Sequence, residues 1–291
     1  MQNQNYEKVN IQWYPGHMTK ARRMIEDNIS NVDAVCEILD ARIPYSSGNP
    51  DIRQIAKDKP RLIILNRSDL ADPDLTARWK QHFENEGCNV LITDAKSGAG
   101  INSFVPTVRK ILSDKLKYYE EKGQTGRALR IMILGIPNVG KSTFINKVSG
   151  RKAAITGDKP GVTKGKQWIV LDKNIELLDT PGILWPKFES QQVGEMLAIT
   201  NAIKTDVFDT ETLASNFMLR LKSIYPDTIS KRYNVEVCED DTGYDLLEKA
   251  ALKRGMLISK GEADLNRMSI TLLKEYHEGK LGRLTLEVPD E

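Results

Sequence analysis

The chain has 291 residues, of which 40% are hydrophobic and 28% are charged, and its formal net charge is +2. This composition is typical of a globular protein, and no apolar run is long enough to cross a bilayer. The N-terminal residues lack the apolar segment of a signal peptide, so we expect a soluble, cytoplasmic protein. The three cysteines are widely separated and form no Cys-x-x-Cys pair, which argues against a structural zinc site or a disulfide framework.

Charge is distributed unevenly along the chain. Residues 206–291 contain 12 basic and 17 acidic side chains, a net charge of −5, whereas the remainder carries +7. If the protein binds nucleic acid, its basic surface is therefore expected mainly within residues 1–205.

The first part of the chain alternates between short apolar runs and charged stretches of helical length. We expect helices over 19–30 and 74–86, and strands over 32–42, 61–66 and 88–93. Such alternation is typical of a parallel sheet with helices on both faces.

Further along, the α/β pattern continues and then changes to amphipathic helices. The expected elements are a helix over 101–121, a strand over 128–134, a helix over 141–149, a hairpin of 167–171 with 175–179, and helices over 213–224, 244–254 and 262–278. We therefore predict a doubly wound, mostly parallel α/β domain over 1–205. A small all-α domain is expected over 206–291.

A glycine-rich motif follows the expected strand at 128–134. Residues 135–142 match the pattern G-x-x-x-x-G-K-S/T, and an expected helix follows. In such a loop, backbone N–H groups turn toward a phosphate, the lysine reaches the β- and γ-phosphates, and the serine hydroxyl binds Mg²⁺. The residues expected to bind nucleotide here are Asn138, Val139, Gly140, Lys141, Ser142 and Thr143.

Two later segments are candidates for the metal and γ-phosphate contacts. The sequence "DTPG" at 179–182 ends the expected hairpin, so Asp179 can hold Mg²⁺ through water and the N–H of Gly182 can meet the γ-phosphate. Thr163, in a loop rich in Gly and Lys, is a candidate for a further Mg²⁺ ligand that orders with GTP. The alternative for Thr163 is an ordinary loop residue.

The sequence "NRSD" at 66–69 resembles a reader of the guanine base. Asn66 can pair with purine N7, and the Asp69 carboxylate can accept from N1–H and the 2-amino group, which adenine lacks. In "DAKSG" at 94–98, the N–H of Ala95 can donate to guanine O6, and Lys96 belongs to the same element. Both segments follow strands, where doubly wound sheets bind ligands.

All five elements of a GTPase site are thus present, but in the order base, base, phosphate, switch, switch. Moving residues 130–200 ahead of 30–120 restores the order found in Ras-like proteins, and the sheet is unchanged by such a rotation. The sequence therefore resembles the circularly permuted GTPases.

Within that group, the chain resembles the ribosome biogenesis GTPase A (YlqF) family over essentially its whole length. The matching segments are "WYPGHMTKA" at 13–21, "DARIPYSSGNP" at 40–50, "GIPNVGKSTFIN", "DTPGILWPKF" and "GKLGRLTLE" at 279–287. The resemblance implies a GTP-hydrolysing factor for late maturation of the large ribosomal subunit, with a helical C-terminal domain that contacts RNA. We expect rRNA and ribosomal proteins as partners, a monomeric state, and no DNA or membrane partner.

Two residues depart from the usual base-reading motifs. Arg67 replaces the lysine of Asn-Lys-x-Asp, and its guanidinium or stem can still cover the purine ring. Asp94 stands where Ser usually begins the Ser-Ala-Lys element, and we expect this change to loosen the loop.

Catalysis needs a group that orients water, and Ile183 and Leu184 after "DTPG" cannot do so. The family resemblance suggests His17 for this role; a solvated turn histidine is the alternative. Asn138 either helps bind an activating K⁺, as in related GTPases, or only shapes its loop.

In the C-terminal region, basic residues at helical spacing form either an rRNA-contacting stripe or a solvated face; they are Lys249, Lys253, Arg254, Arg267 and Lys274. Three functions remain open: a ribosome-dependent GTPase of the large subunit, a factor for the small subunit, and an RNA-binding scaffold that holds GTP without turnover.

Overall fold

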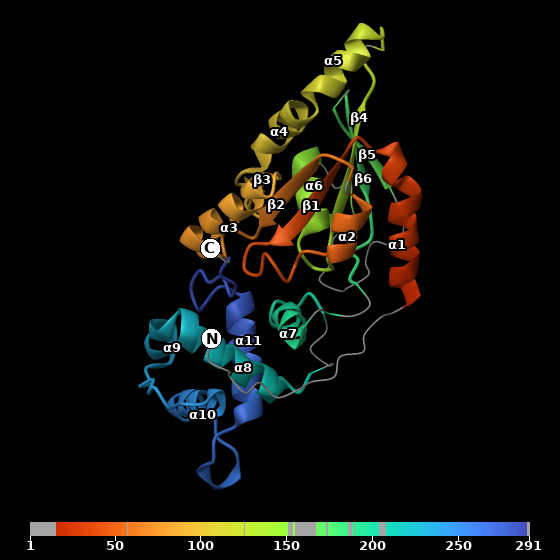
Figure 1. Cartoon of the computed structure of the whole chain (residues 1–291). Helices are drawn as coiled ribbons and strands as arrows, with labels where there is room; N and C mark the ends of the chain where they lie inside the picture. Colours follow the sequence, from red (N-terminus) through yellow and green to blue (C-terminus); the bar gives the residue numbers. More distant parts are fainter. Residues whose placement is uncertain are drawn as a thin grey trace. The chain divides into compact units, whose positions relative to one another are not determined.

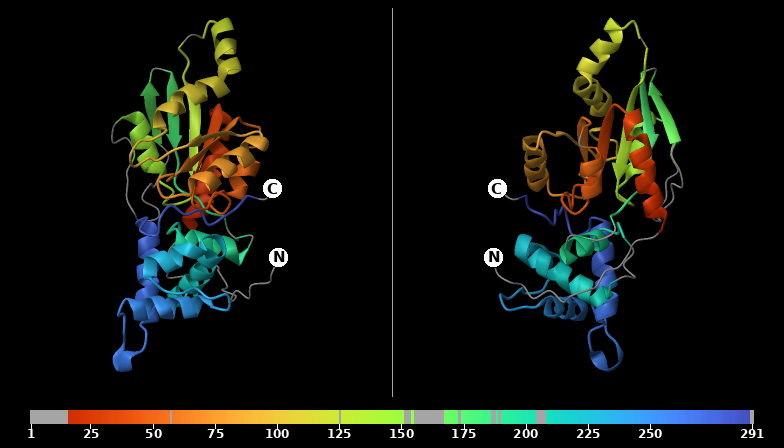
Figure 2. Two further views of the ribbon diagram at one scale, coloured as in Figure 1. Left: turned by 90° about the vertical axis from the view of Figure 1, so that its left-hand side faces the viewer. Right: turned by 45° about the vertical axis from the view of Figure 1, so that its right-hand side comes forward.

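The computed structural model describes residues 16–289, with gaps at 57, 125, 151–153, 155–166, 173, 186–187, 189 and 204–207; for residues 16–18 and 172 it describes the backbone alone. Contacts divide the described chain into two compact units, residues 16–187 with 287–289 and residues 188–286 (Figures 1 and 2).

The first unit contains a six-stranded sheet. Its strands are β1 (Ala34–Asp40), β2 (Arg61–Asn66), β3 (Asn89–Ile92), β4 (Leu129–Gly135), β5 (Gln167–Asp172) and β6 (Ile175–Asp179). Their order is β3-β2-β1-β4-β6-β5, and only the pairing of β5 with β6 is antiparallel (Figure 1). The mostly parallel sheet and the hairpin are therefore confirmed. Every residue of β1 is buried, as expected of a central parallel strand.

Six α-helices belong to this unit: α1 (Gly16–Asn28), α2 (Pro50–Ile55), α3 (Pro73–Asn85), α4 (Phe104–Ile111), α5 (Ser113–Glu121) and α6 (Lys141–Ser149). Ile25 of α1 and Ile52 of α2 pack in one apolar cluster with Val35 of the sheet. Trp79 and Phe83 of α3 belong to a second cluster with residues of β1 and β2. These clusters pack the helices onto the sheet and so hold the strand ends from which the loops project.

Local sequence explains most helix starts, and also two differences from the expected elements. Asp72 caps α3 with its side chain, followed by Pro73 at the first helical position. The expected helix over 101–121 is instead a 3₁₀ turn followed by α4 and α5. The two α-helices meet at Leu112, whose backbone (φ −103°, ψ 19°) is not helical. Helix α2 was not predicted, because among its six residues only Ile52 is buried and the apolar residues show no helical periodicity.

The second unit is all-α, as predicted. It contains α7 (Gln191–Ile199), α8 (Thr210–Ile224), α9 (Pro226–Tyr233), α10 (Gly243–Lys253) and α11 (Leu265–His277), and α8 packs against each of the other four. The ring centroids of Phe217 and Tyr276 lie 4.9 Å apart in its core. Among the described helices, none combines the length and apolarity needed to cross a lipid bilayer.

The division between the units falls between residues 187 and 188, ahead of the expected boundary at 205. Helix α7 belongs to the helical unit because it packs against α8 and because the amide of Asn216 donates to Glu195 at 3.0 Å. Residues 193–199 of α7 are all buried, so this helix shows little of the polar face that marks an amphipathic helix in a sequence.

Candidate nucleotide-binding site

The glycine-rich loop lies between the end of β4 and the start of α6, as the motif predicted. Asn138 has a left-handed backbone (φ 58°), and Gly140 also has a positive φ of 95°. A Cβ atom on Gly140 would overlap the amide nitrogen of Asn66, so only glycine fits this position. The loop therefore depends on the base-reading turn that lies beside it.

Asn66, the last residue of β2, joins three segments. Its Nδ2 donates to the carbonyl oxygen of Val139 at 2.9 Å. Its Oδ1 accepts from the backbone N–H of Ala95 at 3.0 Å and from Oγ1 of Thr93 at 3.2 Å. The sequence had suggested that the N–H of Ala95 donates to guanine O6; in this structure it donates to Asn66. Asn66 thus ties both base-reading turns to the phosphate loop.

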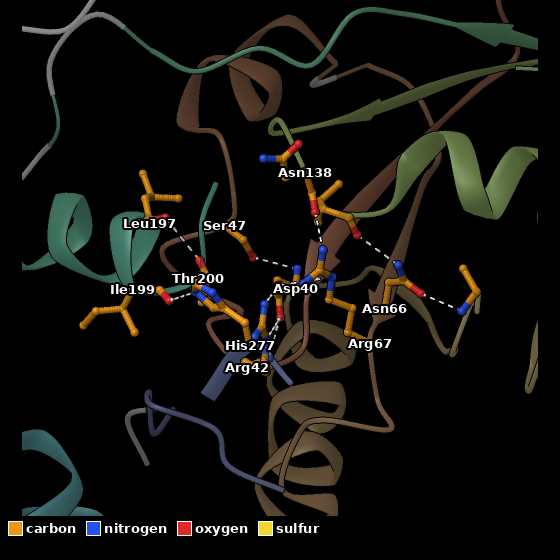
Figure 3. Close-up of polar contacts among 12 residues, drawn as sticks. Asp40, Arg42, Ser47, Asn66, Arg67, Asn138, Leu197, Ile199, Thr200 and His277 are labelled. Carbon is orange, nitrogen blue, oxygen red and sulfur yellow. Dashed lines mark hydrogen bonds and ion pairs between the residues drawn. The ribbon is translucent and has the colours of Figure 1, made fainter. Parts of the chain in front are cut away.

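The guanidinium of Arg67 also bridges to the phosphate loop. Its Nη2 donates to the carbonyl oxygen of Asn138 at 2.6 Å, and its Nε lies 3.8 Å from Oδ2 of Asp40 (Figure 3). Asp40 ends β1 and is paired with Arg42, whose Nε and Nη2 donate to the two carboxylate oxygens at 2.9 and 2.8 Å. Sequence reasoning used "DAR" at 40–42 only as a family signature and missed this cluster.

The ionisation of Asp40 follows from these partners. Burial favours the neutral form, but the charge and hydrogen bonds of Arg42, with the charge of Arg67, hold the pKa of the Asp40 carboxyl below its usual value. A negative charge is therefore retained between the two guanidinium groups at neutral pH.

Asp69 and Asp94 have different places in the two base-reading turns. Asp69 is exposed after β2, so its carboxylate is accessible to a base. Asp94 accepts from the N–H groups of Lys96 at 2.8 Å and Ser97 at 3.1 Å. Burial acts to raise the pKa of Asp94, yet these bonds and the Ser97 hydroxyl lower it. The expectation that Asp94 loosens the loop is wrong, because its carboxylate closes the turn.

The "DTPG" segment lies against the phosphate loop. Nζ of Lys141 contacts Oδ1 of Asp179, and burial lowers the pKa of this lysine although Asp179 acts to raise it. A Cβ atom on Gly182 would lie 2.9 Å from both the N and the Cα of Pro137. The N–H of Ile183 donates to the carbonyl oxygen of Gly135 at 3.2 Å. The two motifs are thus brought together.

The other predicted residues are placed as follows. Ser142 is half-buried and Thr143 is exposed in the first turn of α6. The backbone of His17 lies in the first turn of α1, but its side chain is outside the described structure. Thr163 also lies outside the described residues.

Base-reading and phosphate-binding segments meet at one edge of the sheet, although the former precede the latter along the chain. The protein is therefore a circularly permuted P-loop GTPase. The family described as "50S ribosome-binding GTPase" matches residues 130–220.

Similar proteins identify the family. The ribosome biogenesis GTPase A of Bacillus licheniformis is 42% identical over 281 residues, which cover 97% of this chain and 99% of that protein. The protein of the same name from Thermotoga maritima is 31% identical, with 97% and 95% covered. A solved structure of GNP-bound YlqF from T. maritima superposes with a TM-score of 0.62 at 28% identity, over 94% of this chain and 99% of that one. This chain belongs to the ribosome biogenesis GTPase A family, and it is a GTPase.

Proposed function

We propose that the chain hydrolyses GTP as an assembly factor in late maturation of the large ribosomal subunit, and that this particle stimulates its turnover. The observation that carries the proposal is the burial of Ile183 and Leu184, each 2% exposed, directly after the "DTPG" segment. Neither side chain can orient the attacking water, so turnover by the chain alone is slow and depends on groups brought together on a partner. The family name of its near-full-length relatives supports a ribosomal partner.

The site binds GTP and GDP, and its residues fit a magnesium ion. Lys141 contacts Asp179 and is followed directly by Ser142, so hydroxyl and carboxylate oxygens, the ligands that Mg²⁺ prefers, belong to one neighbourhood. We propose Ser142, Asp179 and Thr163 as the residues that hold it. When bound, the ion neutralises charge on the phosphates.

His17 is proposed to hold or activate the water. We expect the substitution His17→Ala to lower kcat on the ribosomal particle by roughly 10²-fold, the usual contribution of such a group, and to leave nucleotide Kd unchanged. His82→Ala on α3 serves as the matched control. An equal loss of nucleotide binding in His17→Ala would make His17 structural instead.

A potassium ion beside Asn138 is proposed as an activator, since its charge can stand in for an arginine finger. Turnover should then be faster in KCl than in NaCl at equal ionic strength. Equal rates in the two salts would exclude this role for Asn138.

The helical unit is proposed to contact rRNA through a smaller basic set than the sequence suggested. Nζ of Lys249 donates to Asp241 at 2.7 Å and Nη1 of Arg254 to Glu275 at 2.8 Å, so both are engaged within the unit. Lys253, Arg267 and Lys274 are exposed and remain the candidates for phosphate contacts. A monomer acting on ribosomal particles in the cytoplasm, with no DNA or membrane partner, completes the proposal.

The test is GTP turnover by the purified protein alone and with excess large or small ribosomal subunits. Stimulation by large subunits only supports the proposal. Stimulation by small subunits would assign the protein to that particle. Tight GTP binding without turnover under every condition would favour an RNA-binding scaffold.

A further inference from the structure

We propose that Asp40 is a positioning residue of the nucleotide site, which acts by holding the guanidinium of Arg67 on the phosphate loop. The proposal rests on the assignment of Arg67 to the base-reading turn. Asp40 is only 3% exposed at the end of β1, and its Cα is the register partner of Asn66, the residue just before Arg67. Neighbouring strand ends therefore bring the carboxylate of Asp40 and the guanidinium of Arg67 together.

The carboxylate of Asp40 is held in place by Arg42, independently of Arg67. Its two oxygens accept from Nε and Nη2 of Arg42, which is fully buried, and Oδ1 also accepts from the backbone N–H of Arg42 at 3.0 Å. The backbone N–H of Asp40 donates to Oγ of Ser47 at 3.0 Å (Figure 3). With its backbone tied to Ser47 and its carboxylate bonded to Arg42, Asp40 is a rigid support for a second cation.

Arg67 uses two different nitrogens for its two partners. Nη2 donates to the carbonyl oxygen of Asn138 at 2.6 Å, while Nε lies 3.8 Å from Oδ2 of Asp40. A lysine carries all its donors on one nitrogen and cannot present two separate nitrogens to these two partners. The arginine that replaces the usual lysine is therefore matched by a second anchor, and Asp40 supplies it.

Two consequences distinguish this role from a purely structural pairing of Asp40 with Arg42. First, removing the Asp40 charge should weaken nucleotide binding mainly while Arg67 is present. Second, the change should appear in nucleotide Kd and in the rate of nucleotide dissociation.

The experiment is a double-mutant cycle of Asp40→Asn and Arg67→Lys, measured as dissociation of fluorescent GDP from folded protein without ribosomes. We expect Asp40→Asn to speed dissociation about tenfold with Arg67 present and by less than about threefold in the Arg67→Lys background, a coupling typical of close charged pairs. The same fold-change in both backgrounds would overturn the proposal.

Glu37→Gln is the matched control. Glu37 is also a buried carboxylate of β1, but its described bonds go to Arg61 at 3.0 Å and to the N–H of Asn49 at 3.1 Å rather than to the phosphate loop. The substitution should lower stability and leave GDP dissociation unchanged. If Glu37→Gln speeds dissociation as much as Asp40→Asn, the effect is general loosening and the proposal fails.

Should Asp40→Asn fail to fold, GDP dissociation is compared between Arg67→Lys and Arg67→Gln, with Asp40 intact in both. The proposal expects Arg67→Lys to lose most of the affinity that Arg67→Gln loses, whereas wild-type dissociation from Arg67→Lys would refute it. Because no ribosome is present in these measurements, failure here leaves the proposed assembly function standing.

Discussion

The amide Nδ2 of Asn66 donates to the carbonyl oxygen of Val139 at 2.9 Å, across 73 positions of sequence. Through this bond the turn proposed to read the base and the loop proposed to hold the phosphates share one side chain. A movement of either segment is therefore transmitted to the other. Affinity for the base and affinity for the phosphates are expected to change together.

The substitution Asn66→Ala should weaken GTP and GDP binding alike, by roughly 10- to 100-fold. The reason is that a buried carbonyl and a buried N–H each lose their partner, at about 1–3 kcal/mol per group. Fluorescence titration with labelled GTP and GDP measures both constants. Asn102→Ala, at an exposed position, is the control; a selective loss of only one of the two nucleotides would contradict the shared role.

The glycines at the two ends of α6 form a natural pair for comparison. Gly140 and Gly150 both have positive φ, 95° and 65°, but a Cβ on Gly140 would overlap Asn66 while one on Gly150 would meet nothing within 4 Å. Both alanine variants should be destabilised by roughly 1 kcal/mol from backbone strain. Only Gly140→Ala should also lose nucleotide binding, measured by calorimetric titration. Equal binding by the two variants would contradict the steric account.

The exposed carboxylate of Asp69 is expected to set the choice of base. Asp69→Asn replaces an acceptor by an amide that can donate to the 2-oxygen of xanthine, so preference should move from GTP toward xanthosine triphosphate by at least about tenfold. Competition binding with the two triphosphates measures the ratio, with Asp74→Asn on the exposed start of α3 as control. An unchanged ratio would remove Asp69 from the base reader.

We expect Glu195 to make the stability of the helical unit depend on pH. Burial raises the pKa of this carboxyl, although hydrogen bonds from Gln191 and Asn216 act to lower it. A raised pKa means that its contribution to stability is fully present below the unfolded value of about 4.3 and is lost as pH rises through the folded pKa.

Glu195→Gln should therefore be more stable than the wild type at pH 8, by roughly 1 kcal/mol or about 4 °C in Tm, since Oε1 still accepts both bonds. At pH 4 the difference should vanish. Calorimetric scans across this range test it, with Glu248→Gln on the exposed face of α10 as control. If the wild type were more stable than Glu195→Gln at pH 8, the raised pKa assigned to Glu195 would be wrong.

Glu287 anchors the end of the chain to the first unit. Its carboxylate accepts from the N–H of Tyr45 at 2.7 Å and of Ser46 at 3.1 Å, and its carbonyl accepts from Nε1 of Trp79 at 2.9 Å. Glu287→Ala should lower the stability of the first unit by about 1–3 kcal/mol, since two backbone donors lose this acceptor. Glu287→Gln should cost less.

Urea denaturation followed by tryptophan fluorescence measures these differences. Glu121→Ala, at the exposed end of α5, should have no effect. Identical stability of Glu287→Ala and the wild type would show that the carboxylate contributes nothing to the fold.

The sequence located the segments that meet here because phosphate and base recognition require particular residues at fixed spacing. The loop at 135–142 and the turn at 66–69 were found on these grounds, and the apolar runs located their strands. The Asp40, Arg42 and Arg67 cluster could not be predicted in this way. It depends on the register that sets Asp40 beside Asn66 across two strands, and a pattern within one strand carries no information about its neighbour.

The boundary between the units was misplaced for a related reason. Helix α7 was not among the expected elements, since residues 193–199 are all buried and leave no polar face that would mark it in the sequence. Its assignment follows from the contact of Glu195 with Asn216, which joins it to α8. Contacts between elements, rather than the composition of either element, decide where one compact unit ends.

The return of the chain at Glu287 makes the helical unit an insertion rather than a tail. The polypeptide leaves the first unit before residue 188 and re-enters it after Leu286, whose carbonyl still accepts from Arg220 of α8. Within the described residues, a proteolytic nick at one of these two crossings would leave the units joined through the other. A chain truncated after residue 187 loses the Glu287 anchor together with the helices, so its defects cannot be assigned to the loss of the helices alone.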